Sequence, residues 1–169
     1  MDTRERIDQV DAPIPHVTPH TTPIVADMTF WGRGYGVCVF RSPTQKQNLW
    51  WQESAHETPA IYAKGLQALQ RQGFTVTGAV IDGKRGVARV FEAKGIPVQY
   101  CQFHQIKTIT TYLTRKPKTE AGKELRLLTL MLPYTTEALF REALLSWRER
   151  HDAFLTCKNP PRCPHLTHS

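Results

Sequence analysis

The sequence predicts an α/β protein built on a mixed sheet, with the element order β-β-β-α-β-α-β-α followed by additional helices. Two observations support this prediction. Residues 23–54 consist of short apolar runs separated by glycine and proline, which is typical of strands joined by antiparallel hairpins. Beyond residue 57, apolar residues at helical spacing alternate with strand-like runs, which indicates helices that connect further strands of the same sheet.

Length and composition indicate a folded, basic protein. The chain has 169 residues and a net charge of +7, and this length is enough to bury a core without disulfides or metal. No apolar run approaches the roughly 18–20 residues of a membrane span, and the charged N-terminus is unlike a secretory signal. Four scattered cysteines are typical of a reduced, cytoplasmic protein. A pI of 9.4 suggests an anionic partner such as nucleic acid, although a basic protein without such a partner has the same pI.

The first three strands follow an irregular lead. Residues 1–22 show no periodicity, and we expect a disordered linker there. Residues 24–30 and 35–40 form the first two apolar runs, and glycines between them predict a turn. A third run at residues 49–51 completes a predicted three-stranded meander over residues 23–54.

Helices and strands then alternate. Thr58 as N-cap and Pro59 at the first helical position predict a helix start, and Gly73 predicts its end. The runs at residues 76–82 and 96–101 are typical of buried strands, with a short helix between them. We expect strand 76–82 to lie beside strand 24–30.

The remaining chain is predicted to be helical. Three apolar stripes mark three helices, at Ile106, Ile109 and Leu113, at Leu125, Leu128 and Leu132, and at Phe140, Leu144 and Trp147. We therefore expect a sheet-containing core over residues 23–116, a helical segment over residues 117–156 and an irregular tail over residues 157–169. The overall order is that of a ribonuclease-H-like core, because a doubly wound fold does not begin with three hairpin-linked strands.

Two carboxylates occupy unusual positions in the predicted sheet. Asp27 lies inside the apolar first strand, and Asp82 closes the fourth. Taken singly, each has an ordinary explanation, a solvent-facing strand acid and an Asp-Gly turn. On neighbouring strands the two acids would repel each other, and a shared cation would relieve that repulsion. Oxygen ligands without a Cys/His cage suit Mg²⁺ or Mn²⁺.

Three motifs resemble those of DDE transposases of the Mutator superfamily, common in prokaryotic insertion sequences. Residues 25–32 (VADMTFWG) resemble the first acid motif, residues 80–86 (VIDGKRG) the second, and residues 99–105 (QYCQFHQ) the Cys-x-x-His motif that follows. A lone Asp-Gly has no specificity, but the three motifs in this order are fairly specific. The similarity covers roughly residues 23–156.

The resemblance implies a ribonuclease-H-like catalytic core, with Asp27 and Asp82 as catalytic and metal-binding residues. It further implies two Mg²⁺ or Mn²⁺ ions that cleave and join DNA strands at transposon ends. The implied partner is duplex DNA, with no membrane involvement. A homo-oligomer is expected for the full-length protein, in the cytoplasm and associated with the nucleoid.

Cys101 and His104 admit three interpretations. They could be half of a zinc site, with Cys157, Cys163 and His165 as distant partners, but that spacing is poor and we do not expect zinc. They could also be a buried small residue and a helix-start residue. The resemblance favours a third role, a structural one beside the acids.

Basic residues surround these motifs. The cations that we expect to contact DNA are Lys84, Arg85, Arg89, Lys107, Arg115 and Lys116. Any one of them is explained as well by an ordinary solvated helix face. Trp31, Trp50 and Trp51 could stack on bases, although core packing is the commoner use of tryptophan.

A DDE site requires a third carboxylate, and none here matches the family motif for it. The candidates by order are Glu120, Glu124, Glu137, Glu142 and Glu149. We therefore expect a fragment of a transposase core, lacking its DNA-recognition module and its final acid. The alternatives are a ribonuclease-H-like nuclease, which needs a third acid beside Asp27 and Asp82, and a non-catalytic DNA-binding protein derived from a transposon.

Overall fold

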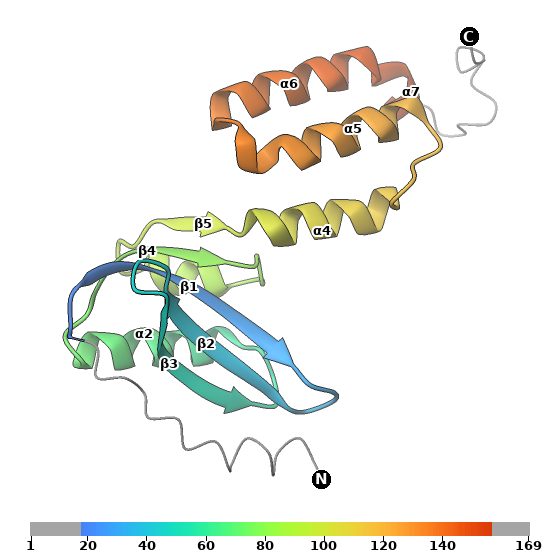
Figure 1. Ribbon diagram of the computed structural model, residues 1–169. Coiled ribbons are helices and arrows are strands. Elements are labelled where there is room, and N and C mark those ends of the chain that lie inside the picture. Colours follow the sequence, from blue (N-terminus) through green and yellow to red (C-terminus); the bar gives the residue numbers. More distant parts are fainter. Residues whose placement is uncertain (1–17, 157–169) are drawn as a thin grey trace. The chain divides into compact units, whose positions relative to one another are not determined.

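The computed structural model describes residues 18–156, in two compact units divided after Cys101 (Figure 1). The first unit contains the sheet. The second contains the later helices, including the first helix after the sheet, which we had grouped with the core on sequence evidence. Residues 1–17 of the linker expected over residues 1–22 lie outside the described residues, as does the expected tail over residues 157–169, with Cys157, Cys163 and His165.

The first unit is a mixed α/β structure, which confirms the predicted fold class. Its elements are β1 (Thr21–Phe30), β2 (Gly36–Ser42), β3 (Gln47–Ser54), α2 (Pro59–Arg71), β4 (Thr75–Ile81), α3 (Val87–Glu92) and β5 (Val98–Tyr100). The sheet order is β3-β2-β1-β4-β5. β2 is antiparallel to β1 and β3, whereas β4 is parallel to β1 and β5. The predicted adjacency of the first and fourth strands is therefore confirmed.

The β1–β2 hairpin follows from local sequence. Gly32 and Gly34 adopt φ values of 83° and 77°, which only glycine reaches without strain. β1 begins at Thr21, inside the stretch expected to be a linker. Its second residue, Thr22, is buried against Ser42 of β2. The Thr22 and Ser42 hydroxyls lie 2.9 Å apart and satisfy each other in the core.

Alternation along the strands builds the core on one face of the sheet. Ile24 and Ala26 of β1 and Ala79 and Ile81 of β4 are buried and pack with residues of α2 and α3. Gly65 of α2 allows close approach to this face, since a Cβ there would stand 2.7 Å from the Phe40 ring. Period-2 burial of this kind is expected where one face of a sheet packs on helices.

The ends of α2 match the sequence signals. Thr58 is its N-cap residue, with Pro59 at the first helical position. Gly73 adopts φ 87° and ends the helix. The amide of Phe74 donates to the Leu69 carbonyl and that of Gly73 to the Gln70 carbonyl, which is the hydrogen-bond pattern of a Schellman cap.

The second unit is helical, as predicted. Its elements are α4 (Gln102–Leu113), α5 (Glu120–Met131), a 3₁₀ turn (Leu132–Tyr134), α6 (Glu137–Arg150) and the short α7 (Asp152–Thr156). The side chains of Thr119 and Thr136 cap α5 and α6. The 3₁₀ turn and α7 were not predicted because neither is long enough to show a periodic stripe.

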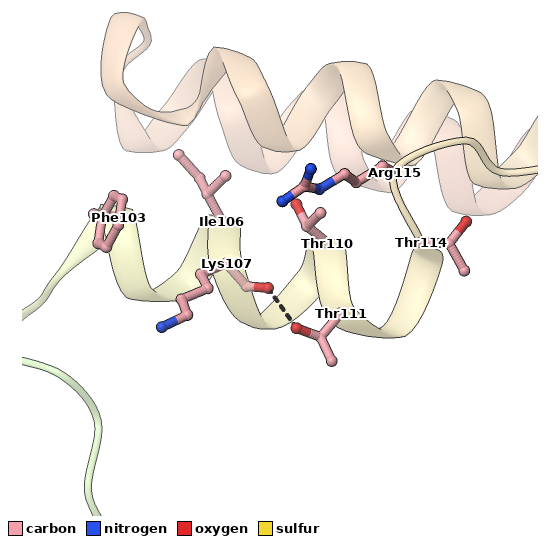
Figure 2. Close-up of a pocket in the computed structure, with 7 residues that line it drawn as sticks. All are labelled: Phe103, Ile106, Lys107, Thr110, Thr111, Thr114 and Arg115. Carbon is pink, nitrogen blue, oxygen red and sulfur yellow. Dashed lines mark hydrogen bonds between the residues drawn. The ribbon is translucent and has the colours of Figure 1, made fainter. Parts of the chain in front are cut away.

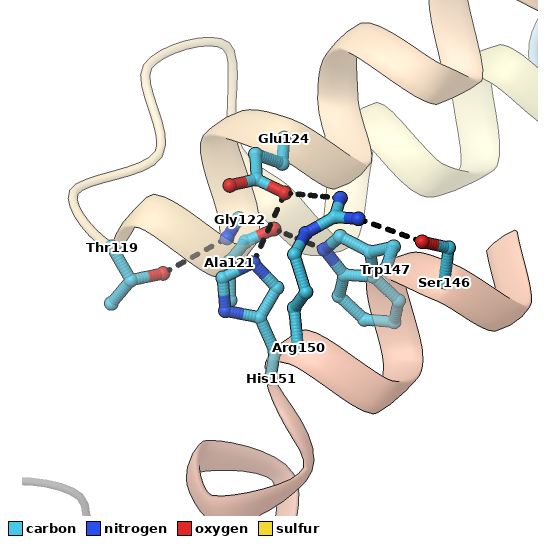
Figure 3. Close-up of polar contacts among 8 residues, drawn as sticks. All are labelled: Thr119, Ala121, Gly122, Glu124, Ser146, Trp147, Arg150 and His151. Atoms are coloured by element: carbon cyan, nitrogen blue, oxygen red, sulfur yellow. Dashed lines mark hydrogen bonds and ion pairs between the residues drawn. The ribbon is translucent and has the colours of Figure 1, made fainter. Parts of the chain in front are cut away.

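Polar contacts join α5 to α6 (Figure 3). The indole of buried Trp147 donates to the Ala121 carbonyl at 2.9 Å. Glu124 accepts from Arg150 at 2.9 Å, and the same oxygen lies 3.1 Å from Nε2 of His151. Within residues 18–156, no helix combines the length and hydrophobicity needed to cross a bilayer.

Candidate active site at the carboxyl ends of β1 and β4

Asp27 and Asp82 occupy the same level of adjacent parallel strands. Val25 of β1 pairs with Val80 of β4, and each aspartate follows its paired valine by two residues. Both aspartates are half-buried, while their strand neighbours Ala26 and Ile81 are buried in the core. Strand alternation therefore places Asp27 off the core face, and Asp82 directly follows the last, buried residue of β4.

The turn after β4 orients Asp82. Gly83 adopts φ 101°, which favours glycine, and the backbone amide of Lys84 donates to Oδ1 of Asp82 at 2.9 Å. A turn closed by an aspartate side chain in this way is a common Asx-turn. It fixes one carboxylate oxygen of Asp82 and leaves lone pairs on both oxygens for a cation.

Glu57 is a third carboxylate at this edge, and we did not predict it from the sequence. Its side chain is 13% exposed and lies 3.8 Å from Nζ of Lys84. The Tyr62 hydroxyl donates to Oε1 of Glu57 at 2.7 Å. Burial raises the pKa of Tyr62, and the carboxylates of Glu57 and Asp82 add to this effect, so the phenol remains a neutral donor.

Cys38 lies within electrostatic reach of two of these acids. Burial raises the pKa of the Cys38 thiol to about 12, with smaller contributions from Glu57 and Asp27. A thiol in such surroundings is inert at neutral pH. Cys38 is therefore a packing residue and not a nucleophile.

Topology explains why Glu57 lies at this edge. β3 is antiparallel to β2, and β2 is antiparallel to β1, so β3 and β1 run in the same direction. The segment after β3 therefore emerges at the same edge as the carboxyl ends of β1 and β4. An acid directly before the Thr58–Pro59 helix start was the sequence signal for this position.

The structure places the Cys-x-x-His residues in different units. The amide of Cys101 donates to the carbonyl of Ile81 at 2.7 Å, which ties the end of β5 to the residue before Asp82. Cys101 is half-buried with a free thiol. His104 lies on α4 in the second unit, where its ring meets that of Phe103 edge-on with centroids 5.5 Å apart.

The six cations expected to contact DNA are all exposed and divide between the two units. Lys84 and Arg85 follow β4, and Arg89 lies on α3. Lys107 lies on α4, and Arg115 and Lys116 follow it. Of the tryptophans, Trp50 packs against Phe40 at a centroid distance of 5.3 Å, whereas Trp31 and Trp51 are exposed.

The five candidates for a third acid all lie on helices of the second unit. Two of them form ion pairs within one helix, Glu120 with Lys123 and Glu137 with Arg141. Glu124 of α5 pairs with Arg150 of α6. The hydrogen bond from Arg150, and to a smaller extent that from His151, holds the pKa of Glu124 below its usual value. Helix contacts therefore account for three of the five carboxylates.

The donor set fits a hard divalent cation. Mg²⁺ usually takes one or two protein carboxylates and completes its shell with water and substrate phosphates, and Asp27 with Asp82 supplies two carboxylates at one level. Among residues 18–156, no group of three or more His, Cys, Asp or Glu side chains converges closely enough to hold a metal by itself. Asp27 and Asp82 are therefore the two residues that could hold such a cation here, together with water and substrate oxygens.

Comparison with known proteins finds a likeness at the level of structure and none at the level of sequence. The sequence matches no family model and no curated protein. Among solved structures, the chain resembles the large terminase nuclease from the thermophilic phage G20c, with 19% sequence identity and a TM-score of 0.33. The match covers 62% of this chain and 62% of that chain. The fold assignment therefore rests on the sheet order and register of this chain.

Proposed function

We propose that this chain is the catalytic-core portion of a metal-dependent DNA-processing enzyme of the DDE transposase kind. Its reaction would be phosphodiester cleavage and strand transfer at the ends of a DNA element. The supporting observation is the placement of Asp27 and Asp82 at one level of β1 and β4. The Asp, Asp-Gly and Cys-x-x-His motifs add support for a transposase in particular.

In this proposal, Asp27 and Asp82 hold the divalent ions, and the Lys84 amide keeps Asp82 in one orientation. Held by these two residues, Mg²⁺ or Mn²⁺ would supply Lewis-acid activation of the attacking hydroxyl and charge stabilisation of the leaving oxygen. The protein contributes position and charge. No covalent intermediate is needed, which agrees with the inert thiol of Cys38.

The exposed cations would bind the DNA backbone. Three of them, Lys84, Arg85 and Arg89, follow Asp82 within seven residues of the sequence. They would neutralise phosphates near the reacting bond. Lys107, Arg115 and Lys116 would bind DNA phosphates on the second unit. Such binding weakens steeply with salt, because each neutralised phosphate releases counterions.

A ribonuclease-H-like nuclease is the second candidate, and Glu57 is the observation that favours it. That function needs a third carboxylate near the aspartates, and Glu57 lies close enough to act with Asp82 on the pKa of Tyr62. Its contacts with Tyr62 and Lys84 would have to loosen before it could join a metal site.

Two measurements test the proposal. Calorimetric titration with Mn²⁺ should show binding to the wild-type protein and none to Asp27→Asn or Asp82→Asn. Glu53→Gln on β3, an exposed acid, is the matched control and should bind as the wild type does. Equal Mn²⁺ binding by the wild type and the double aspartate variant would refute the metal site.

The second measurement uses labelled DNA with Mn²⁺. For residues 1–169 we expect weak, salt-sensitive binding to duplex DNA, at most trace nicking and no strand transfer, because only two acids form the site. Efficient cleavage that is lost in Glu57→Gln would favour the nuclease. Cleavage lost on changing Glu120, Glu124, Glu137, Glu142 or Glu149 would identify the third acid of a transposase. Normal DNA binding without any Mn²⁺ binding would favour a non-catalytic DNA-binding protein.

A further inference from the structure

A groove of about 530 Å³ runs along α4 in the second unit (Figure 2). Phe103 lies at the start of the helix, and Thr114 and Arg115 lie at its far end. Ile106, Lys107, Thr110 and Thr111 lie between them. α4 has 12 residues, so at 1.5 Å per residue the groove follows a helix about 18 Å long.

The charge of the groove is of one sign. Lys107 and Arg115 contribute two cations, and the sequence from residue 93 to residue 119 contains no Asp or Glu. Arg126 of α5 donates to the Thr110 hydroxyl at 3.5 Å, which adds a third cation behind the groove. A stretch of chain that carries cations and no carboxylate is complementary to a polyanion.

The hydroxyl groups of the groove suit phosphate oxygens. Because Thr110 accepts from Arg126, its own proton is free to donate to a ligand. The Thr111 hydroxyl donates to the Lys107 carbonyl at 3.0 Å and retains acceptor capacity. Thr114 adopts φ 65°, a left-handed conformation that strains a β-branched residue. Backbone strain of this kind is frequent at binding sites.

The exposed ring of Phe103 suits an unpaired strand better than a duplex. Its side chain is 67% exposed at the end of the groove. In a duplex the bases are stacked on one another, so a phenyl ring on the surface has no base face to contact. An unpaired strand offers every base face, and stacking on an aromatic side chain contributes about 1–3 kcal/mol per base.

We propose that the α4 groove binds a single strand of DNA, with its phosphates on Lys107 and Arg115 and a base stacked on Phe103. The identity of the ligand as DNA rests on the proposed function. The groove would hold that strand without help from Asp27 or Asp82.

Binding is measured by fluorescence anisotropy of a labelled oligo-dT and of a duplex of equal length, in EDTA and at low salt. The wild type should prefer the single strand. Lys107→Gln combined with Arg115→Gln should weaken single-strand binding at least tenfold. The matched control, Lys123→Gln with Arg141→Gln, removes the same charge from the same unit, where both cations already pair with glutamates. It should change binding less than threefold.

Phe103→Leu tests the stacking contact. It should weaken single-strand binding roughly fivefold or more and leave duplex binding unchanged. Tyr112→Leu is the control, because Tyr112 is 84% exposed on the same helix but does not line the groove. Thr111→Lys adds a cation to the groove and should tighten binding.

Equal losses in the two double variants would overturn the proposal, and so would equal effects of Phe103→Leu and Tyr112→Leu or a wild-type preference for duplex. Because EDTA removes divalent ions, these results do not depend on the aspartate site. If the wild type binds the single strand through the α4 groove but does not bind Mn²⁺, only the proposed catalytic function is refuted. If the wild type binds Mn²⁺ but the α4 groove does not bind the single strand, only the groove proposal is refuted.

Discussion

Asp27 and Asp82 lie at one level of the sheet because Val25 pairs with Val80, and Asp27 follows Val25 by two positions as Asp82 follows Val80. Parallel strands share the same rise per residue, so the β1–β4 pairing brings the backbones of Asp27 and Asp82 to about the same level of the sheet. The pairing of two strands far apart in the sequence thus brings two acidic residues to one region of the sheet.

This arrangement predicts the effect of removing one charge. In EDTA and at low salt, Asp27→Asn or Asp82→Asn should leave the free energy of unfolding unchanged or raise it by up to about 1 kcal/mol, because like charges repel. Urea denaturation measures the change, and added salt should shrink it. A loss well above 1 kcal/mol would show instead that the carboxylate stabilises the fold.

The Tyr62–Glu57 contact should stabilise the edge of the sheet. Tyr62 is fully buried, and its hydroxyl donates to a largely buried carboxylate. Tyr62→Phe should cost about 1.5–3 kcal/mol by urea denaturation, the range for hydrogen bonds to charged groups. Tyr35→Phe is the control, because that hydroxyl lies 3.4 Å from the exposed Glu53 and should contribute much less. Similar losses in both variants would contradict this account of Glu57.

Gly65→Ala should destabilise the first unit. The added Cβ would stand 2.7 Å from atoms of both the Phe40 and Trp50 rings. Overpacking of this kind costs about 1–3 kcal/mol, which outweighs a gain in helix propensity of about 1 kcal/mol. In Gly78→Ala the nearest atom is 3.7 Å away, so this control should be neutral or slightly stabilising. A thermal melt of each variant compares them, and equal melting temperatures would contradict the α2 packing.

Acid should loosen the α5–α6 hairpin through Glu124. Arg150 and then His151 lower the pKa of Glu124 from its ordinary value of 4.5. A lowered folded-state pKa means that the stabilisation is present above the unfolded value and is lost as pH falls through the folded value. The NMR signal of the Trp147 indole N–H, bonded to Ala121, reports on the hairpin.

Glu124→Gln should remove this part of the acid dependence. Glu142→Gln is the control, because Glu142 forms no ion pair within residues 18–156 and its replacement should leave the acid profile unchanged. An unaltered profile in Glu124→Gln would show that the ion pair does not stabilise the hairpin.

The sequence by itself determined the local structure and the order of the elements. Period-2 runs, the Thr58–Pro59 start and the Gly73 stop act through near neighbours, so they predicted β1 to β3 and the ends of α2. Asp27 and Asp82 were recognised because a carboxylate at an apolar strand is costly unless a cation or hydrogen bonds satisfy it. Whether they bind metal stays a prediction.

Only the tertiary structure decided which distant groups meet. Glu57 reaches the site edge through the directions of β1, β2 and β3 and through its contacts with Tyr62 and Lys84, none of which a local pattern encodes. The separation of α4 from the sheet unit likewise depends on contacts between elements. Local sequence sets backbone preferences within a few residues, whereas strand pairing and side-chain packing bring together groups that are far apart in the chain.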